Sequence, residues 1–417
     1  RAVRAVKLDI TPLPAVLHAR AAHAAWIAAG GLTVPDLPAP PPEGWALVAD
    51  ALFGIGLQRP LDGRYADWIT QLNAQPCPRL ALDIPSGLDA DSGQRLGPCF
   101  TATHTVSFIA LKPGLLTLDG PDQCGELHLR EIDVDAEDLA PAPGHEITPA
   151  LFAGRLAPRA RNSHKGSYGD VAIVGGEGLA ARGLGMTGAA LLAASAALHA
   201  GAGRVLVALL DDGQMAIDMA QPELMFRRFD ALALEQLTVV CGCGGGEAVR
   251  AVLPAVLARA ARLVLDADAL NALAADAALR AEVVSRAARG LPTVLTPHPL
   301  EAARLLGVSA VEVQADRLNA AQQLAEQFDC VTVLKGSGTV IAAPGYPPAV
   351  NPTGNARLAT AGTGDVLAGM VGAHLAAGAE AQPAASQAVY QHGLAADRWP
   401  AGRQLTASAL ARQITQN

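Results

Sequence analysis

Asp365 is well placed for chemistry because it follows a glycine turn at the start of an apolar helical run. Residues 361–365 read AGTGD and continue into VLAGMVGAHLAAG. Gly362 and Gly364 allow the backbone to approach a ligand closely, and the free N–H groups of a helix start favour an anion such as phosphate. A carboxylate beside such an anion is unfavourable unless it does chemistry or holds a metal. The alternative is an ordinary acidic residue in a first helical turn.

Other loops in the second half of the chain also follow strand-like segments. They are the glycine loop 242–246, the acids Asp266 and Asp268, His298 between two prolines, and the run Lys335, Gly336, Ser337, Gly338 and Thr339. A His between prolines projects from a rigid loop rather than from a helix interior. A Lys that opens a glycine turn can clamp a phosphate, although a hairpin turn would have the same sequence. A nucleotide phosphate would fit against residues 335–339 and Gly364, with a second substrate near Asp365.

The first part of the chain carries a similar set of residues. Asp50 and Asp83 each end a strand-like run, and the glycine loop 54–60, Ser86 and Lys112 follow such runs as well. One acid at a strand end is commonly a turn former, but two acids and a hydroxyl at successive strand ends indicate a site. Carboxylate and hydroxyl oxygens from Asp50 and Ser86 suit a hard cation.

The elements that must position these residues alternate between strand and helix. We expect strands near residues 2–8, 45–53, 79–84, 105–111, 126–134, 170–174, 204–210, 238–240, 262–265, 292–295, 331–334 and 340–343, with helices at 15–29, 65–73, 189–200 and after Asp365. This order predicts an α/β fold of two three-layer αβα domains with mostly parallel sheets. Ligands then lie at the carboxyl ends of the strands. A Pro- and Ala-rich segment predicts a linker at 141–146 between domains at 1–140 and 147–417.

One glycine motif is not assigned to a ligand. Gly183, Gly185 and Gly188 formally match a dinucleotide-binding fingerprint. Residues 175–182 separate them from the preceding strand, whereas the fingerprint requires its tight turn directly at the strand end. We therefore disfavour a dinucleotide fold for this segment.

Composition excludes several partner classes. The net charge is −8 and aromatic residues make up 4% of the chain, which disfavours nucleic-acid binding. No uninterrupted apolar run reaches the about 18 residues of a membrane span. The six cysteines show no zinc or redox spacing, so we expect reduced thiols and a cytoplasmic location. We also expect a homo-oligomer.

The motifs together resemble a known family. NSHKGSYGDVAIVGG, GMTGAALLAASAALHAGAGRV, PELM, LDADALN, TPHPLE, LKGSGTVIA and AGTGDVLAGM resemble the ADP- or ATP-dependent NAD(P)H-hydrate dehydratases, of ribokinase-like fold. VADALFGIGLQRPLDGRYADWI, LALDIPSGLDADSG and TVSFIALKPG resemble the Rossmann-like NAD(P)H-hydrate epimerase domain. The resemblance covers residues 147–417 and much of residues 1–135. It implies nicotinamide nucleotide repair, in which the first domain epimerises the R and S hydrates and the second dehydrates the S form.

The resemblance also implies roles for particular residues. In the second domain, Ala189, Gly244, His298 and Asp365 would contact the hydrate, and Lys335, Gly336, Ser337, Gly338, Thr339 and Gly364 would hold ADP or ATP. In the first domain, Gly54, Ile55, Gly56, Leu57, Gln58, Arg59, Pro60 and Asp83 would contact the hydrate, and Asp50 and Ser86 a potassium ion. Asp365 would act as general base on the C6 hydroxyl, with Mg²⁺ bridging the nucleotide phosphates.

Two departures from the family pattern stand out. The epimerase family carries an N-N-G-G-D-G-type loop before its second strand, and this chain begins after that point, so we expect an impaired epimerase and a competent dehydratase. Cys243 occupies a position between glycines where the family usually has proline.

Two other functions remain open at this stage. One is a ribokinase-like kinase for a vitamin-like alcohol, and the other is a non-catalytic nucleotide-binding scaffold. The sequence does not separate ADP from ATP or NADH from NADPH hydrate, and it identifies no base for the elimination step.

Overall fold

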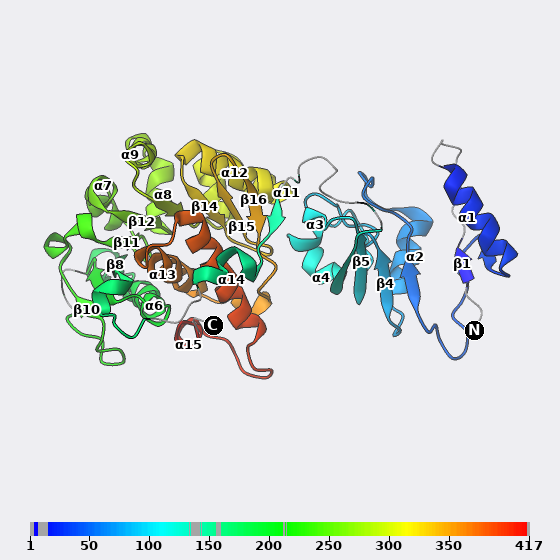
Figure 1. Cartoon of the computed structure of the whole chain (residues 1–417), viewed down its shortest axis with the longest axis horizontal. Coiled ribbons are helices and arrows are strands. Elements are labelled where there is room, and N and C mark those ends of the chain that lie inside the picture. The colour runs from blue at the N-terminus through cyan, green and yellow to red at the C-terminus, as the bar shows by residue number, and fades with distance from the viewer. Residues whose placement is uncertain are drawn as a thin grey trace. The chain divides into compact units, whose positions relative to one another are not determined.

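The computed structural model describes residues 4–6, 16–132, 134, 142, 144–155, 160–211, 213 and 215–414. Two compact units divide the chain, one of residues 1–115 and 119–139 and the other of residues 116–118 and 140–417. Figure 1 shows both units, which we call the N-terminal and C-terminal domains. The expected strand at 2–8 is described only at 4–6, and the expected linker only at residues 142 and 144–146; the remainder of each lies outside the described residues.

The N-terminal domain contains two parallel sheets. The smaller pairs β1 (Arg4–Val6) with β2 (Leu32–Val34), and the larger has the order β3-β4-β5-β6 (Val48–Asp50, Arg79–Leu82, His104–Phe108 and Glu126–Arg130). The helices are α1 (Val16–Ala28), α2 (Gly63–Asn73), α3 (Pro113–Leu116) and α4 (Gly120–Cys124). Helix α2 is amphipathic and buries Ile69 in a cluster with Val48, Ala81 and Phe100, as expected for a helix that covers one sheet face.

The C-terminal domain is built on a ten-stranded sheet of order β10-β9-β8-β11-β12-β13-β14-β15-β16-β7. Only β15 is antiparallel to its two neighbours in this sheet. In chain order the strands are β7 (His145–Glu146), β8 (Asp170–Gly175), β9 (Arg204–Leu209), β10 (Met225–Phe226), β11 (Thr238–Cys241), β12 (Arg262–Leu265), β13 (Thr293–Leu295), β14 (Val331–Leu334), β15 (Val340–Ala343) and β16 (Tyr346–Val350).

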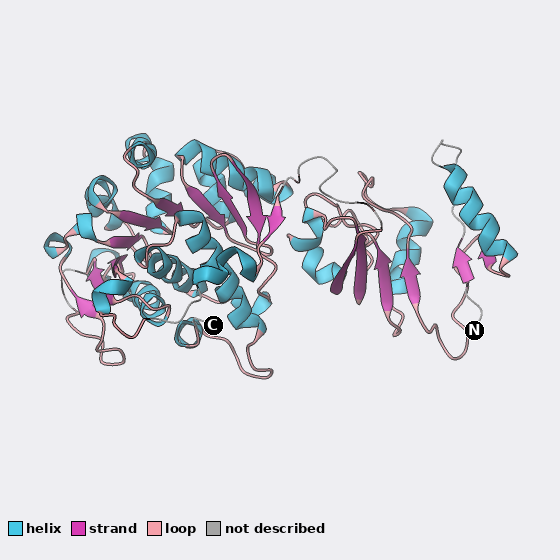
Figure 2. Cartoon of the chain, in the orientation of Figure 1, coloured by secondary structure: helices cyan, strands magenta, loops and turns pink. Residues whose placement is uncertain are grey.

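Helices cover both faces of this sheet, as Figure 2 shows by colour. The α-helices are α5 (Leu179–Arg182), α6 (Thr187–His199), α7 (Val249–Arg259), α8 (Asp268–Ala275), α9 (Ala277–Ala288), α10 (Pro299–Leu306), α11 (Ala310–Ala315), α12 (Arg317–Phe328), α13 (Thr363–Ala376), α14 (Ala381–Asp397) and α15 (Ala407–Arg412). Short 3₁₀ segments occur at Pro149–Arg155, Lys165–Tyr168, Phe229–Ala231, Leu234–Gln236 and Ala356–Leu358.

The side chains of β8 point alternately to the two faces of the sheet, and this explains why the hydrophobic core has two layers. Val171 and Ile173 pack with residues of α6, α13, α14 and α15, whereas Ala172 and Val174 pack with residues of α7, α8, α10 and α12. Successive side chains of a strand point to opposite faces, so an uninterrupted apolar strand is buried on both sides. The expected α/β class with helix-covered parallel sheets is confirmed.

Three details differ from the expectations or refine them. Strand β7 pairs with β16, so the described end of the expected linker belongs to the C-terminal sheet. Helix α5 lies between β8 and the Gly183–Gly188 motif, in agreement with the rejection of a dinucleotide fingerprint. Among the described residues, no helix combines the length and the apolar character required to cross a bilayer.

Candidate active site

The glycine loop after β11 is shaped by close backbone approaches. Gly242 and Gly244 have φ angles of 117° and 58°, a region that favours glycine. A Cβ on Gly242 would lie 2.0 Å from the backbone O of Asp266, and one on Gly244 would lie 2.9 Å from the Cβ of Ala189. Two predicted substrate-binding residues, Ala189 and Gly244, therefore lie side by side, although they are far apart in sequence.

A buried ion pair lies at the ends of β12 and β14. The Nζ of Lys335 donates to Oδ1 of Asp266 at 2.7 Å, and the hydroxyl of Thr296 donates to the same oxygen at 2.7 Å. The Asp266 side chain is 2% exposed and that of Lys335 is 18% exposed. Burial acts to lower the pKa of Lys335, but the carboxylates of Asp266 and Glu301 outweigh it and raise that pKa. Lys335 is therefore held as a cation at the sheet edge.

Asp365 lies in the first turn of α13, beside this pair. Carboxylate oxygens of Asp365 and Asp266 and the Sγ of Cys243 all lie within 4.8 Å of one another. Burial and the nearby Asp266 raise the pKa of Asp365 to about 7, although Cys243 and Lys335 oppose the shift. A carboxyl that is taken out of water beside another acid is harder to ionise. Asp365 can therefore gain or lose a proton near neutral pH.

The start of α13 faces the amine of Lys335. Gly362 adopts φ = 90°, and a Cβ there would clash with Leu192 at 2.5 Å. A Cβ on Gly364 would lie 3.4 Å from the Nζ of Lys335, so the amine and the helix N-terminus adjoin. The buried His392 donates from Nε2 to the backbone O of Thr363 at 3.0 Å and supports this turn. An amine next to free helical N–H groups is suited to a phosphate.

Arg317 supports the loop 335–339 through hydrogen bonds to its backbone. Its guanidinium donates to the backbone oxygens of Leu334, Lys335 and Gly338 at 3.2–3.3 Å. Arg317 is 2% exposed, and burial lowers its pKa to about 10. Gly336 has φ = 143°, and a Cβ there would lie 2.8 Å from this guanidinium. Because the loop carbonyls point to Arg317, the loop conformation is fixed before any ligand arrives.

His298 has a structural role in addition to its predicted one. Its Nδ1 accepts hydrogen bonds from the backbone N–H groups of Leu300 and Glu301 and so caps α10. With Nδ1 as acceptor, the ring proton lies on Nε2, which is 3.3 Å from Oε1 of Glu301. Burial and the charge of Lys335 lower the pKa of His298. Burial raises the pKa of Glu301 to about 7, so a second carboxyl in this region titrates near neutrality.

The C-terminal site thus combines predicted residues with others that the sequence did not single out as site residues. Lys335, Gly364 and Asp365 lie close together, and Gly244 adjoins Ala189. His298 lies near Lys335, whose charge contributes to lowering the pKa of His298. The added residues are Cys243, Asp266, Thr296, Glu301 and Arg317. Asp266 and Glu301 carried a signal, since Asp266 follows a strand and Glu301 lies in the first turn of a helix, but Lys335, the partner of Asp266, is distant in sequence.

In the N-terminal domain, Asp50 and Ser86 bind each other. Oδ2 of Asp50 accepts from the backbone N–H of Ser86 at 2.7 Å, and Oδ1 accepts from the Ser86 hydroxyl at 2.7 Å. The Ser86 hydroxyl is also within 3.2 Å of the backbone O of Phe53. Burial raises the pKa of Asp50, and its hydrogen-bond partners among the described residues are uncharged. A buried carboxylate with neutral partners gains from a bound cation.

Asp83 forms an ion pair with Lys112 at the neighbouring strand end. The amine of Lys112 also donates to the Ser107 hydroxyl at 3.2 Å and to the backbone O of Phe108 at 3.0 Å. Asp83 adopts φ = 68°, which is uncommon for a residue with a Cβ and is enriched at functional sites.

The glycine loop after β3 lines a cavity. Its volume is about 440 Å³, and its walls are Leu52, Phe53, Gly54, Gly56, Leu57, Gln58 and Arg59. Ile55, which is 62% exposed, and Pro60 and Asp83 are not among these walls. A larger cavity of about 680 Å³ lies along β9, β10 and α7 and contains none of the predicted site residues. The chemistry-bearing residues therefore mark the site better than cavity size does.

Comparisons with known proteins agree with the two-domain organisation. Residues 172–417 match the family described as NAD(P)H-hydrate dehydratase, and residues 15–114 match the family described as YjeF-related protein N-terminus. The bifunctional NAD(P)H-hydrate repair enzyme of Escherichia coli (strain K12) is 38% identical over 95% of this chain and 76% of its own length.

Two further relatives cover the C-terminal domain. The ADP-dependent (S)-NAD(P)H-hydrate dehydratase of Neisseria meningitidis is 42% identical over 64% of this chain and 89% of its own length. The solved structure of the ADP/ATP-dependent NAD(P)H-hydrate dehydratase of Bacillus subtilis, co-crystallised with ATP and Mg²⁺, is 30% identical, with a TM-score of 0.51 over 64% of this chain and 95% of that one.

Proposed function

The chain belongs to the family of bifunctional NAD(P)H-hydrate repair enzymes, and we propose how its residues divide the work. The C-terminal domain dehydrates the S form of NAD(P)H hydrate and consumes an adenine nucleotide. The N-terminal domain belongs to the epimerase half of the family, whose reaction is the interconversion of the R and S hydrates. The observation that carries the proposal is the half-buried Asp365 carboxyl, which lies beside a lysine and a free helix N-terminus.

Asp365 is the general base of the phosphoryl transfer. Its carboxylate takes the proton from the C6 hydroxyl of the hydrate, and the hydroxyl oxygen then attacks the terminal phosphorus of the nucleotide. A pKa of about 7 suits this step, because a base is most effective when its pKa lies near the working pH. Loss of phosphate from C6, together with a proton from the neighbouring carbon, restores the reduced nicotinamide ring.

Lys335 and the start of α13 hold the transferred phosphoryl group. The amine of Lys335 and the N–H groups near Gly364 adjoin, so both can stabilise negative charge on the phosphoryl oxygens. Gly336, Ser337, Gly338 and Thr339 hold the rest of the nucleotide in the loop fixed by Arg317. Ala189, Gly244 and His298 contact the hydrate.

The carboxylates fit a magnesium ion on the nucleotide. The carboxylates of Asp266 and Asp365 lie close together beside Cys243, and the carboxylate of Asp266 offers a hard oxygen ligand of the kind that Mg²⁺ prefers. When bound, Mg²⁺ would neutralise phosphate charge. Asp266 also keeps Lys335 oriented toward α13.

In the N-terminal domain, the loop 54–60 and Asp83 contact the hydrate, and Asp50 and Ser86 hold potassium. The cavity along that loop supports the first assignment. The buried Asp50 carboxylate with neutral partners supports the second. Replacing KCl by a large organic cation salt at equal ionic strength should lower the unfolding temperature of this domain, and Asp50→Asn should remove that dependence. Equal unfolding temperatures for the wild type in both salts would rule out a potassium site.

The proposal includes a cytoplasmic location and a homo-oligomer. All six cysteines are described and all are free thiols, which supports a reducing compartment. The oligomeric state remains a prediction that light scattering of the purified chain would test.

One experiment tests the central reaction. The chain is incubated with the S form of NADH hydrate and either ADP or ATP, and the absorbance of reduced nicotinamide is followed. Recovery with one of the nucleotides supports repair and identifies the donor. Nucleotide consumption without recovery would indicate a kinase, and binding without turnover would indicate a scaffold; either result rejects the proposed function.

A further inference from the structure

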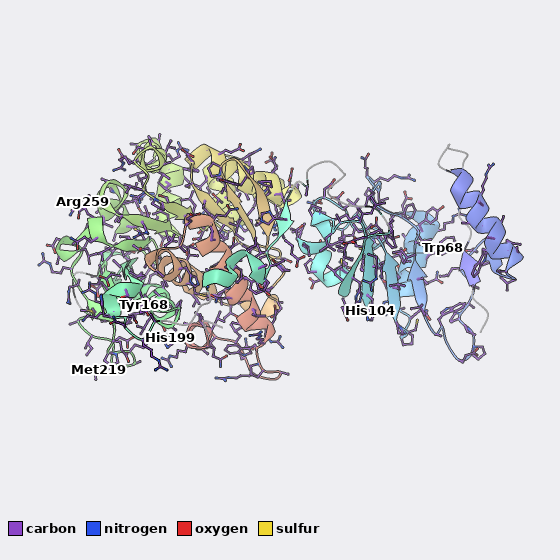
Figure 3. All side chains as sticks on the ribbon, viewed as in Figure 1. Trp68, His104, Tyr168, His199, Met219 and Arg259 are labelled. Carbon is purple, nitrogen blue, oxygen red and sulfur yellow. The ribbon has the colours of Figure 1, made fainter. Side chains whose placement is uncertain are left out.

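Three metal-ligating side chains gather on the surface of the N-terminal domain, away from the residues discussed above. His104 opens β5, and Glu126 and His128 lie on the neighbouring β6. The register pairs His104 with Glu126 directly, and His128 is two residues further along, so it points to the same face as Glu126. Figure 3 labels His104 on this domain.

The donor atoms of these side chains converge. The Nε2 atoms of His104 and His128 lie 3.8 Å and 3.4 Å from the two carboxylate oxygens of Glu126. The three groups offer ligand atoms that all lie within 4.8 Å of one another. Bonds of about 2.0–2.2 Å to a tetrahedral metal separate neighbouring ligand atoms by about 3.4 Å. Small rotations of the exposed His104 and Glu126 side chains would therefore close the site.

The hydrogen bonds of Thr103 prepare His104 to bind a metal. The Thr103 hydroxyl donates to the backbone O of Arg79 at 2.9 Å and accepts from the backbone N–H of Arg79 at 2.9 Å. Nδ1 of His104 lies 3.0 Å from the same oxygen. The Thr103 hydroxyl therefore holds the His104 ring through Nδ1 and leaves Nε2 for a second partner. Nε2 faces the carboxylate of Glu126, and a hydrogen bond at the second ring nitrogen is what orients metal-ligating histidines.

We propose that His104, Glu126 and His128 bind a divalent transition-metal ion of the zinc class at the surface, joining β5 to β6. Two imidazoles and one carboxylate are a ligand set for Zn²⁺, and water would fill the remaining position. Imidazole nitrogens disfavour Mg²⁺ and K⁺, so this ion is distinct from those assigned to nucleotide and to Asp50. The two rings are stacked, with centroids 5.9 Å apart, so the two imidazoles lie next to each other beside the carboxylate.

Zinc binding by the full chain tests this proposal directly. The apo-protein is titrated with ZnCl₂ against a competing chelating dye, and the number and affinity of sites are compared among the wild type, His104→Ala, Glu126→Gln and His128→Ala. Each of the three substitutions should weaken the same site at least tenfold. His23→Ala is the matched control, because His23 is exposed and its ring contacts only a hydroxyl, Thr33, at 3.1 Å among the described residues.

A stability measurement gives a second readout that does not depend on enzyme activity. Zn²⁺ that binds only the folded state should raise the unfolding temperature of the N-terminal domain, and His128→Ala should lose that increase while unfolding at nearly the wild-type temperature without zinc. Equal zinc affinity in the wild type and the three variants would overturn the proposal. Loss of zinc binding in His23→Ala as well would also overturn it, because the binding would then be dispersed over surface histidines.

Discussion

Each domain carries an aspartate–lysine pair at the carboxyl edge of its parallel sheet, and the two pairs differ in their surroundings. Asp83 and Lys112 have side chains that are 26% and 18% exposed, whereas Asp266 is 2% exposed beside Lys335. Lys112 also donates to Ser107 and Phe108. In both domains a residue with a Cβ adopts a positive φ at the strand end, Asp83 at 68° and Ala267 at 50°.

The important difference is the second carboxylate. In the C-terminal domain Asp365 adjoins the pair, and the pKa of its carboxyl rises to about 7. In the N-terminal domain the other acid, Asp50, is bound by Ser86. A pair of opposite charges fixes geometry, whereas two acids with one lysine provide a group that exchanges a proton near neutral pH. The following experiments test that contrast.

The largest effect should come from Asp365→Asn. The amide keeps the shape of the side chain but cannot accept the proton, so dehydration should fall by about 10²–10⁴-fold, while nucleotide affinity changes little. Steady-state rates and equilibrium nucleotide binding are the two measurements. Asp230→Asn, at an exposed ion pair with Arg228, is the control. Near-normal turnover in Asp365→Asn would reject its role as base.

The two lysines should differ in their contribution to stability. Lys335→Met leaves the buried Asp266 without its cation and should lower the free energy of unfolding by about 3 kcal/mol or more. Lys112→Met breaks a more exposed pair and should cost about 1 kcal/mol or less. Urea unfolding followed by tryptophan fluorescence reports on both domains, since Trp399 belongs to the C-terminal domain and Trp26, Trp45 and Trp68 to the N-terminal domain. Equal losses of unfolding free energy in Lys335→Met and Lys112→Met would show that the difference in burial does not make one ion pair more stabilising than the other.

The pH dependence of dehydration should report Asp365. Because the ionised carboxylate is the base, kcat/KM should reach a plateau at alkaline pH and fall to half of it as the pH drops to about 7. Asp266→Asn should move this midpoint to lower pH, since Asp266 raises the pKa of Asp365. Glu301→Gln is the control, because the pKa of Glu301 also lies near 7. If Glu301→Gln abolishes the pH dependence, Glu301 and not Asp365 is the titrating group.

A smaller effect is expected in the pH dependence of the free energy of unfolding. The pKa of Asp365 is raised from 3.8 to about 7 on folding, so the folded state holds this proton more tightly than the unfolded chain. The contribution of Asp365 to the free energy of unfolding therefore decreases as the pH rises from about 4 to about 7. Asp365→Asn should unfold at a higher temperature than the wild type at pH 8 and at a similar one at pH 4. A lower unfolding temperature at pH 8 would contradict the raised pKa.

The strand ends, and with them the sheet edge at which the candidate site residues lie, were predictable from the sequence. Apolar runs that end in Asp266, Lys335 and the glycines around Cys243 identify the sheet edge, because that pattern is local. The pairing of Asp266 with Lys335 was not predictable, since 69 residues separate them and only the strand order brings them together. The support of the loop 335–339 by Arg317 depends on helix packing, and an alanine in the sequence does not indicate that its φ will be positive, as it is at Ala267.

The pairing of β7 with β16 bears on how the dehydratase domain can be separated from the rest of the chain. His145–Glu146 form an edge strand, and Ile147, which follows it, is fully buried and donates its N–H to the backbone O of Val350 at 2.9 Å. A fragment that starts after residue 147 would leave the β16 edge unpaired and open to intermolecular strand addition. Genetic dissection of the two activities should therefore cut upstream of His145, so that the dehydratase fragment retains its own outermost strand.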